Sequence, residues 1–169
     1  MDAMEAILTR RSIRRYTAEP VAEDVIKKLL EAAMYAPSAH NQQPWHFVVI
    51  QERKILDRIP EFHPYSTMLG SAPLAILICG DSTLFKSPHF WPQDCAAATQ
   101  NILLAARALG LGAVWMGVYP KDTLVDGLRT LFGMPEQIIP FSLIAIGYPA
   151  EERPRANRFN ERRIHYNRW

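Results

Sequence analysis

The side chains best suited to binding an anion lie in one short segment near the N-terminus. Residues 10–16 have the sequence RRSIRRY. In an extended stretch, side chains alternate, so Arg10, Ser12 and Arg14 share one face while Arg11 lies on the other. Two guanidinium groups and a hydroxyl suit a phosphate with a neighbouring polyol, because guanidinium binds phosphate through paired hydrogen bonds. Dense arginine also occurs on ordinary solvated surfaces, so this segment alone leaves both interpretations open.

A second polar segment lies between two prolines. Residues 36–45 have the sequence APSAHNQQPW, and Pro37 and Pro44 each restrict the backbone. Amide side chains present a donor and an acceptor together. This set suits the edge of a heterocycle that carries carbonyls and a ring N–H. A polar loop whose amides make turn hydrogen bonds is the alternative.

A third segment combines small residues with glycine. Residues 110–117 have the sequence GLGAVWMG and follow an alanine-rich stretch. A glycine at position 117 would let a backbone amide approach a planar ligand. A tightly packed helix followed by a turn is the alternative.

Motifs for several other chemistries are absent from the sequence. No GxGxxG, P-loop or GxSxG pattern occurs, and the five histidines show no metal-ligand spacing. We therefore expect no metal site. Cys79 and Cys95 form no CxxC pair and lie in apolar stretches, which predicts inert core thiols in a reducing, cytoplasmic environment.

Arginines are concentrated near the two ends of the chain. By itself this distribution does not identify a ligand, but together with the motifs above it favours a phosphorylated one. The chain has 19 Lys+Arg and 17 Asp+Glu, yet residues 153–169 hold six arginines and one acid. Solvated chain ends, nucleic acid or a phosphorylated small molecule would each account for this. No nucleic-acid-binding motif accompanies the arginines, which disfavours nucleic acid. No apolar run approaches the roughly 18 residues needed to span a membrane.

The hydrophobic pattern predicts a single domain over residues 1–169 with alternating helices and strands. Helices are predicted over 4–10, 21–35, 52–58, 94–109 and 121–132, and strands over 45–51, 74–79, 113–116 and 138–146. Asp122 is a candidate N-cap, and Pro140 indicates either an edge strand or an irregular strand start. The arm at 153–169 ends in large apolar residues, which indicates packing on something, such as another subunit. The fold class is α+β or α/β.

Taken together, these segments resemble the nitroreductase family of FMN-dependent oxidoreductases. RRSIRRY, APSAHNQQPWHFVVI, GLGAVWMG and the closing IAIGYPAEERP and IHYNRW match in order, from residue 5 to residue 169. The resemblance is to the short members of the family. It implies an α+β fold with a central mixed sheet flanked by helices, and an intertwined homodimer with FMN at the interface.

The resemblance also implies which residues contact FMN. Arg10 and Ser12 would meet the phosphate or ribityl chain, and Arg14 the ribityl or the N1/O2 edge of the flavin. Pro37, Ser38, Ala39 and Asn41 would come from the partner subunit, near the dimethylbenzene and pyrimidine edges of the flavin. The full set is Arg10, Arg11, Ser12, Arg14, Pro37, Ser38, Ala39, Asn41, Gln43, Trp115, Met116, Gly117, Arg158 and Arg162.

Several members of this set carry more specific expectations. Met116 and Gly117 would present backbone N–H groups towards flavin N5. Arg158 is the better match to the family's C-terminal phosphate arginine, and Arg162 is the alternative. Many relatives have an Asn and a Lys before the second strand, whereas residues 63–70 contain no lysine. Arg14 is therefore expected to be the only cation at that edge.

The activity implied by the resemblance is transfer of hydride from NAD(P)H to FMN, and then to a small acceptor such as a nitroaromatic or a quinone. Both half-reactions would use one site by a ping-pong mechanism, with the flavin carrying the chemistry. His40 and Tyr65 are candidate proton donors. Two alternatives remain open. One is another reaction on the same fold, such as flavin cleavage, dehalogenation or dehydrogenation, and the other is FMN storage or sensing without turnover.

Overall fold

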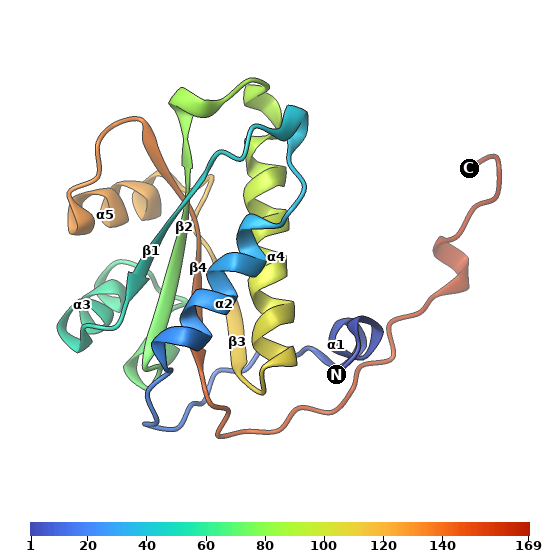
Figure 1. Cartoon of the computed structure of the whole chain (residues 1–169), viewed down its shortest axis with the longest axis horizontal. Coiled ribbons are helices and arrows are strands. Elements are labelled where there is room, and N and C mark those ends of the chain that lie inside the picture. The colour runs from blue at the N-terminus through green and yellow to red at the C-terminus, as the bar shows by residue number, and fades with distance from the viewer.

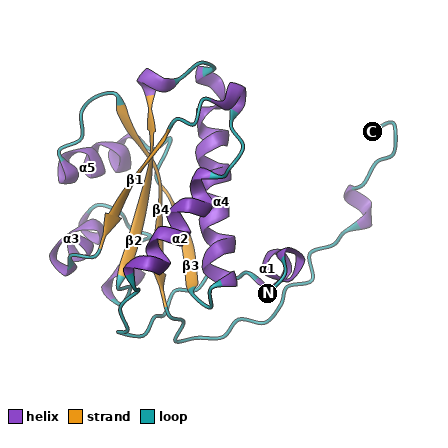
Figure 2. Ribbon diagram, viewed as in Figure 1, coloured by secondary structure: helices purple, strands orange, loops and turns teal.

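The chain folds into a four-stranded sheet with helices on both faces (Figures 1 and 2). The computed structural model describes all 169 residues. The strands are β1 (Trp45–Ile50), β2 (Leu74–Asp81), β3 (Gly112–Gly117) and β4 (Ile138–Gly147), in the spatial order β1-β2-β4-β3. The helices are α1 (Ala3–Thr9), α2 (Glu23–Met34), α3 (Arg53–Arg58), α4 (Trp91–Ala108) and α5 (Asp122–Phe132). The expected α+β fold is confirmed.

The one parallel pairing in the sheet is made by the segment that follows α1. All pairs among the four strands are antiparallel. The parallel element is a single bridge between Ser12 and Ala113, where the Ile13 N–H donates to the Ala113 carbonyl at 3.1 Å. Residues 10–14 therefore run beside β3, which is an edge strand.

The last strand lies inside the sheet, between β2 and β3, so the edge interpretation of Pro140 is wrong. The alternative, an irregular strand start, is confirmed. Pro140 is opposite Cys79, where the register shifts between Ile78 and Cys79. A bulge leaves a residue outside the regular ladder, which allows a proline to occupy an interior strand.

Two apolar clusters cover the two faces of the sheet. Leu29 of α2 and Ile102 of α4 pack with Ile76 on one face. Leu128 of α5 packs with Leu77 on the other face. Because β2 is buried on both sides, its apolar residues form a continuous run instead of alternating with polar residues.

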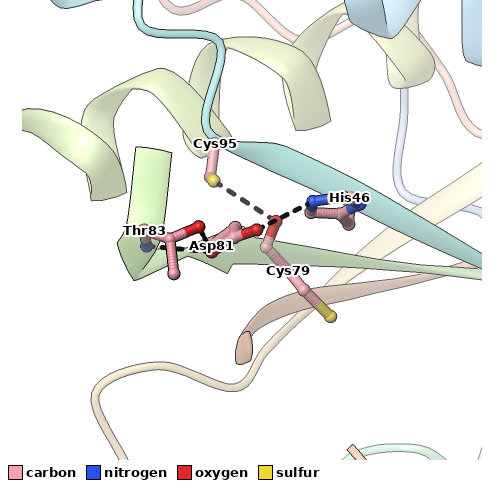
Figure 3. Close-up of polar contacts among 5 residues, drawn as sticks. All are labelled: His46, Cys79, Asp81, Thr83 and Cys95. Atoms are coloured by element: carbon pink, nitrogen blue, oxygen red, sulfur yellow. Dashed lines mark hydrogen bonds and ion pairs between the residues drawn. The ribbon is translucent and has the colours of Figure 1, made fainter. Parts of the chain in front are cut away.

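The two cysteines face opposite clusters, and both are buried (Figure 3). The Sγ atom of Cys95 lies 4.0 Å from the carbonyl oxygen of Cys79, while the Cys79 side chain points away from it (Figure 3). Burial raises the pKa of the Cys79 thiol to about 12 and also raises the pKa of Cys95. Burial therefore favours the protonated form of both thiols, and their expected position in the apolar core is confirmed.

The strand that carries Cys79 ends in a polar turn. The Asp81 carboxylate accepts hydrogen bonds from the Thr83 N–H at 2.9 Å and the Thr83 hydroxyl at 2.6 Å, and it lies 3.2 Å from His46 Nε2 (Figure 3). The Thr83 hydroxyl, with smaller contributions from the Thr83 N–H and His46, lowers the pKa of Asp81. These contacts fix the start of the segment that leads to α4.

The helix boundaries differ from the predicted ones in two places. α4 begins at Trp91, three residues earlier than predicted, because Pro92 occupies its first turn, where a missing N–H costs nothing. Asp122 is wrong as an N-cap. It is the first residue of α5, and the capping residue, Lys121, makes no side-chain capping bond.

The C-terminal arm leaves the sheet, passes α1 and ends away from the rest of the chain (Figure 1). It contains one helical turn, Glu161–Arg163. Phe159, Tyr166 and Trp169 are 75%, 83% and 101% exposed. Within one copy of the chain, these large apolar side chains have little to pack against. No helix in the structure combines the length and the apolar character needed to cross a bilayer.

Candidate functional site

Three arginines gather where the N-terminal segment meets the arm. We call Arg10, Arg11 and Arg158 the arginine cluster. All three line a cavity of about 590 Å³, together with Arg155 and Phe159. Burial lowers the pKa of Arg10, and the nearby charges of Arg158 and Arg11 lower it further. None of the three forms an ion pair with a carboxylate, so the cluster has the charge and the donors to bind an anion.

A neighbouring carboxylate holds the segment in place and is not a partner of the cluster. Glu151 accepts a hydrogen bond from the Arg14 N–H at 2.6 Å and pairs with Arg153 at 2.9 Å. The Arg14 hydrogen bond is the main reason that the pKa of Glu151 is lowered. The Ala150 N–H also donates to the Arg15 carbonyl at 2.9 Å. The chain after β4 thus fastens the segment that carries Arg10 and Arg14.

A second cavity lies at the other end of β3. We call it the β3 cavity; it has a volume of about 400 Å³. Its lining is Arg14, Pro64, Tyr65, Thr67, Met68, Val114, Trp115, Met116 and Gly117. Since residues 10–14 run beside β3, they connect the arginine cluster to this cavity along one edge of the sheet. An elongated ligand with an anionic end and a ring system would fit along this edge.

A second cation, Lys121, lies near the β3 cavity without lining it, and the expectation that Arg14 is the only cation at that edge stays a prediction. Lys121 Nζ lies 5.6 Å from the centroid of the Tyr65 ring, and Tyr65 lines the cavity. Lys121 lies just before α5, far along the chain from residues 63–70. The sequence of residues 63–70 cannot predict that a lysine so far along the chain lies nearby.

His63 is a second residue that the sequence analysis missed. It is buried, and its Nε2 donates to the Gly117 carbonyl at 3.0 Å. Burial is the main cause of its lowered pKa, and the charge of Lys121 acts in the same direction. The ring is therefore neutral at pH 7 and holds the last residue of β3 in place. A histidine directly before a proline gave no signal of this role.

The backbone N–H and C=O groups of successive residues in β3 point alternately towards β4 and away from it. The Ala113 carbonyl accepts the Ile13 N–H, so the backbone groups of Ala113 point away from β4. Because backbone groups alternate along a strand, those of Trp115 and Gly117 point the same way, whereas those of Met116 face β4. The Met116 side chain is also buried. Trp115 and Gly117 thus offer backbone donors at the open edge of the sheet.

The segment between the two prolines forms a loop with an unusual backbone. His40, Asn41 and Gln43 have positive φ values of 50°, 50° and 46°. The Ser38 hydroxyl accepts from the Gln43 N–H at 3.0 Å, and the Gln43 amide donates to Asn41 at 2.7 Å. The loop is therefore a defined conformation with exposed polar side chains.

Two of the predicted groups, the loop at 37–43 and the arginine cluster, lie at opposite ends of α4. The loop is tied to the first turn, where Asp94 accepts the Ala39 N–H at 2.9 Å. The last turn contacts α1, where Arg107 donates to Thr9 at 3.0 Å, next to Arg10. From Asp94 to Arg107 the helix rises about 20 Å. One chain therefore does not bring the loop to the arginine cluster.

The two candidate arginines in the arm also differ in position. Arg158 lines the cavity with Arg10, and the two charges interact. Arg162 lies farther along the arm, in its helical turn, and does not line that cavity. The geometry favours Arg158 over Arg162 as the partner of Arg10.

These features define an α+β protein in which the arginine cluster and the β3 cavity lie along one edge of the sheet, and comparison with known proteins gives its family. The model described as "Nitroreductase family" matches residues 7–63 and 61–148. The chain belongs to the nitroreductase family. A protein of Methanothermobacter thermautotrophicus, provisionally named NADH dehydrogenase/NAD(P)H nitroreductase, is 55% identical over all of this chain and 88% of its own length.

Two crystal structures extend this comparison. A provisionally named NADH oxidase from Clostridium acetobutylicum has a TM-score of 0.95 and 44% identity, covering 97% of this chain and 99% of its own. A provisionally named nitroreductase from Desulfovibrio desulfuricans, solved in complex with FMN, has a TM-score of 0.86 and 32% identity, covering 100% and 98%. Both agree with the sheet and helices described above.

Proposed function

We propose that two copies of this chain bind FMN between them and act as an NAD(P)H-dependent oxidoreductase on small acceptors. The observation that carries the proposal is the arginine cluster without carboxylate partners, joined along β3 to the β3 cavity. The name of the Methanothermobacter relative and the FMN in the Desulfovibrio structure support it.

The residues present fit the chemistry of FMN. Arg10, Arg11 and Arg158 would hold the phosphate, since the dianion supplies the negative charge that the cluster lacks. Ser12 would meet the ribityl chain. These groups follow one another along the strand edge in the order in which the ligand would need them.

The other end of the edge would hold the flavin ring. Arg14 would face its pyrimidine side, where a cation stabilises negative charge on a bound ring. The backbone N–H groups of Trp115 and Gly117, which point away from β4, would face the same space. Their orientation favours Gly117 over Met116 as the donor to flavin N5.

The remaining predicted contacts would come from a second copy of the chain. Pro37, Ser38, Ala39, Asn41 and Gln43 lie about 20 Å along α4 from the arginine cluster. In a two-fold pair with antiparallel α4 helices, the loop of one copy would meet the flavin ring in the site that the arginine cluster of the other copy begins. The exposed apolar side chains of the arm would be covered by the same pairing.

When bound, FMN supplies the redox chemistry, accepting hydride from NAD(P)H and passing electrons to a nitroaromatic, a quinone or a similar acceptor. The chain's own residues bind and orient. Arg14 lines the β3 cavity and Lys121 lies near it, beside Tyr65. The Trp115 and Tyr65 side chains would border the space where a donor or acceptor stacks. Neutral His63 holds Gly117 in place.

The test is the visible absorption spectrum of the purified full-length protein, followed by anaerobic titration with NADH and with NADPH. We expect a yellow protein with about one FMN per chain that loses its visible flavin absorbance with at least one donor. A yellow protein that neither donor bleaches would indicate flavin storage or sensing. A colourless protein that takes up no added FMN would overturn the proposal.

A further inference from the structure

One buried amide connects three separate segments beside the candidate site. Gln42 is 5% exposed and Asp94 is also 5% exposed. Gln42 Nε2 donates to Asp94 Oδ2 at 2.5 Å, while Asp94 Oδ1 accepts the Ala39 N–H at 2.9 Å. Asp94 takes part in no ion pair. These two N–H groups are therefore its partners in the protein.

The other end of the same amide is also fully used. Gln42 Oε1 accepts the N–H groups of both Lys86 and Ser87, each at 2.9 Å. A single side chain thus ties the loop at 37–43 to the first turn of α4 and to the segment that precedes α4. Glutamine is suited to this because one end donates and the other accepts.

The loop needs such support because its backbone is strained. Positive φ values at His40, Asn41 and Gln43 are unfavourable for residues with a side chain and persist only where contacts hold them. The hydrogen bonds among Ser38, Asn41 and Gln43 are exposed to water. The Gln42–Asp94 hydrogen bond, in contrast, is buried and does not compete with water.

We propose that Gln42 and Asp94 are positioning residues, which hold the 37–43 loop in the conformation that meets FMN in the paired chain. This inference rests on the proposed function. Neither side chain belongs to the predicted contact set, and both are buried away from the solvent that a ligand would replace. They would act through the backbone and side chains of Ser38, Ala39 and Asn41.

The role of the pair can be tested by exchanging the amide at position 42 and the carboxylate at position 94, first singly and then together. Gln42→Glu removes the donor and places two carboxylates together. Asp94→Asn turns an N–H towards the N–H of Gln42. In the double variant, the new amide at position 94 donates to the new carboxylate at position 42, whose other oxygen still accepts from Lys86 and Ser87. Gln93→Glu is the matched control, because it adds the same charge at an exposed position one residue away from Asp94.

Two measurements on the full chain give the outcome. One is the FMN dissociation constant of the apoprotein, and the other is hydrogen exchange of peptides covering residues 36–44. We expect each single variant to bind FMN about ten- to a hundredfold more weakly, with faster exchange in those peptides. The double variant should return to within about threefold of wild type, and Gln93→Glu should match wild type.

The inference and the proposed function can fail separately. A wild-type chain that binds no FMN would overturn the proposed function. If the wild type binds FMN and Gln42→Glu binds it within twofold, the positioning role is wrong. A double variant no better than the single variants also overturns it. Should the charged variants not fold, Gln42→Met removes the donor without adding charge, and unchanged FMN affinity in that variant would likewise overturn the positioning role.

Discussion

The imidazole of His63 holds the end of β3 through one hydrogen bond, from its Nε2 to the carbonyl oxygen of Gly117 at 3.0 Å. The other ring nitrogen, Nδ1, is buried and has no hydrogen-bond partner in the protein. Burial lowers the pKa of the ring. The end of the strand that borders the β3 cavity is thus held by a histidine whose neutral form is favoured by burial.

This arrangement predicts a pH dependence of stability. The pKa of His63 in the folded state is lower than in the unfolded state, where it is about 6.5. The unfolded state therefore binds more protons below that pH, and the stability from His63 is lost as the pH falls through the folded pKa. The free energy of unfolding should decrease between pH 7 and pH 5.

His63→Gln provides the comparison, since its amide can donate to the same carbonyl and does not titrate. Urea unfolding at several pH values should show a shallower decrease for this variant than for the wild type. Identical slopes would mean that His63 does not contribute to the pH dependence.

Arg10→Ala should weaken FMN binding by about ten- to a hundredfold, because it removes charged hydrogen bonds to the phosphate. The measurement is the quenching of FMN fluorescence on binding. Arg163→Ala is the control: it removes the same charge from an exposed arm residue outside the cluster's cavity. Unchanged FMN occupancy in Arg10→Ala would count against the phosphate assignment.

The two arm arginines should differ in the same assay. Arg158→Ala is expected to weaken FMN binding several-fold or more, because its charge lies beside Arg10. For Arg162→Ala, the change in the logarithm of the FMN dissociation constant should be less than half of the change for Arg158→Ala. A larger loss with Arg162→Ala would move the phosphate contact to the helical turn of the arm.

Gly112→Ala should separate the N-terminal segment from β3. A Cβ at this position would lie 2.7 Å from Ile13 Cγ2 and 2.8 Å from Ile13 Cβ, too close for either to remain in place. We expect a loss of about 1–3 kcal/mol in stability and weaker FMN binding. Gly70→Ala is the control, since nothing lies within 4 Å of its added Cβ. Thermal unfolding and FMN titration of both variants measure the difference, and equal behaviour would show that the contact with Ile13 is not needed.

Local pattern predicted much of the fold. The sequence predicts β2 and the alanine-rich helix α4 because burial on several sides leaves a continuous run of apolar residues. Pro140 illustrates the limit. The proline predicts an irregular start of β4. Whether β4 lies at an edge depends on which distant strands pair with it, and the local sequence does not contain that information.

In the candidate site, too, some residues are predictable from their local sequence and others depend on contacts between distant segments. Arg10, Ser12, Arg14, Trp115 and Gly117 are in segments whose local sequence is distinctive, and the structure places them along one strand edge. Lys121 and His63 depend on contacts between elements far apart in the chain. Gln42 lies within a recognised motif, yet only the fold shows that it is buried against Asp94 and not facing a ligand.

The length of α4 has a genetic consequence. In the proposed pair, each chain gives its arginine cluster to one site and its loop to the other. A chain damaged in the cluster and a chain damaged in the loop would both fail when paired with themselves. When the two damaged chains pair with each other, one site receives both defects and the other receives none. Two defective alleles of this gene in one cell would therefore restore part of the activity.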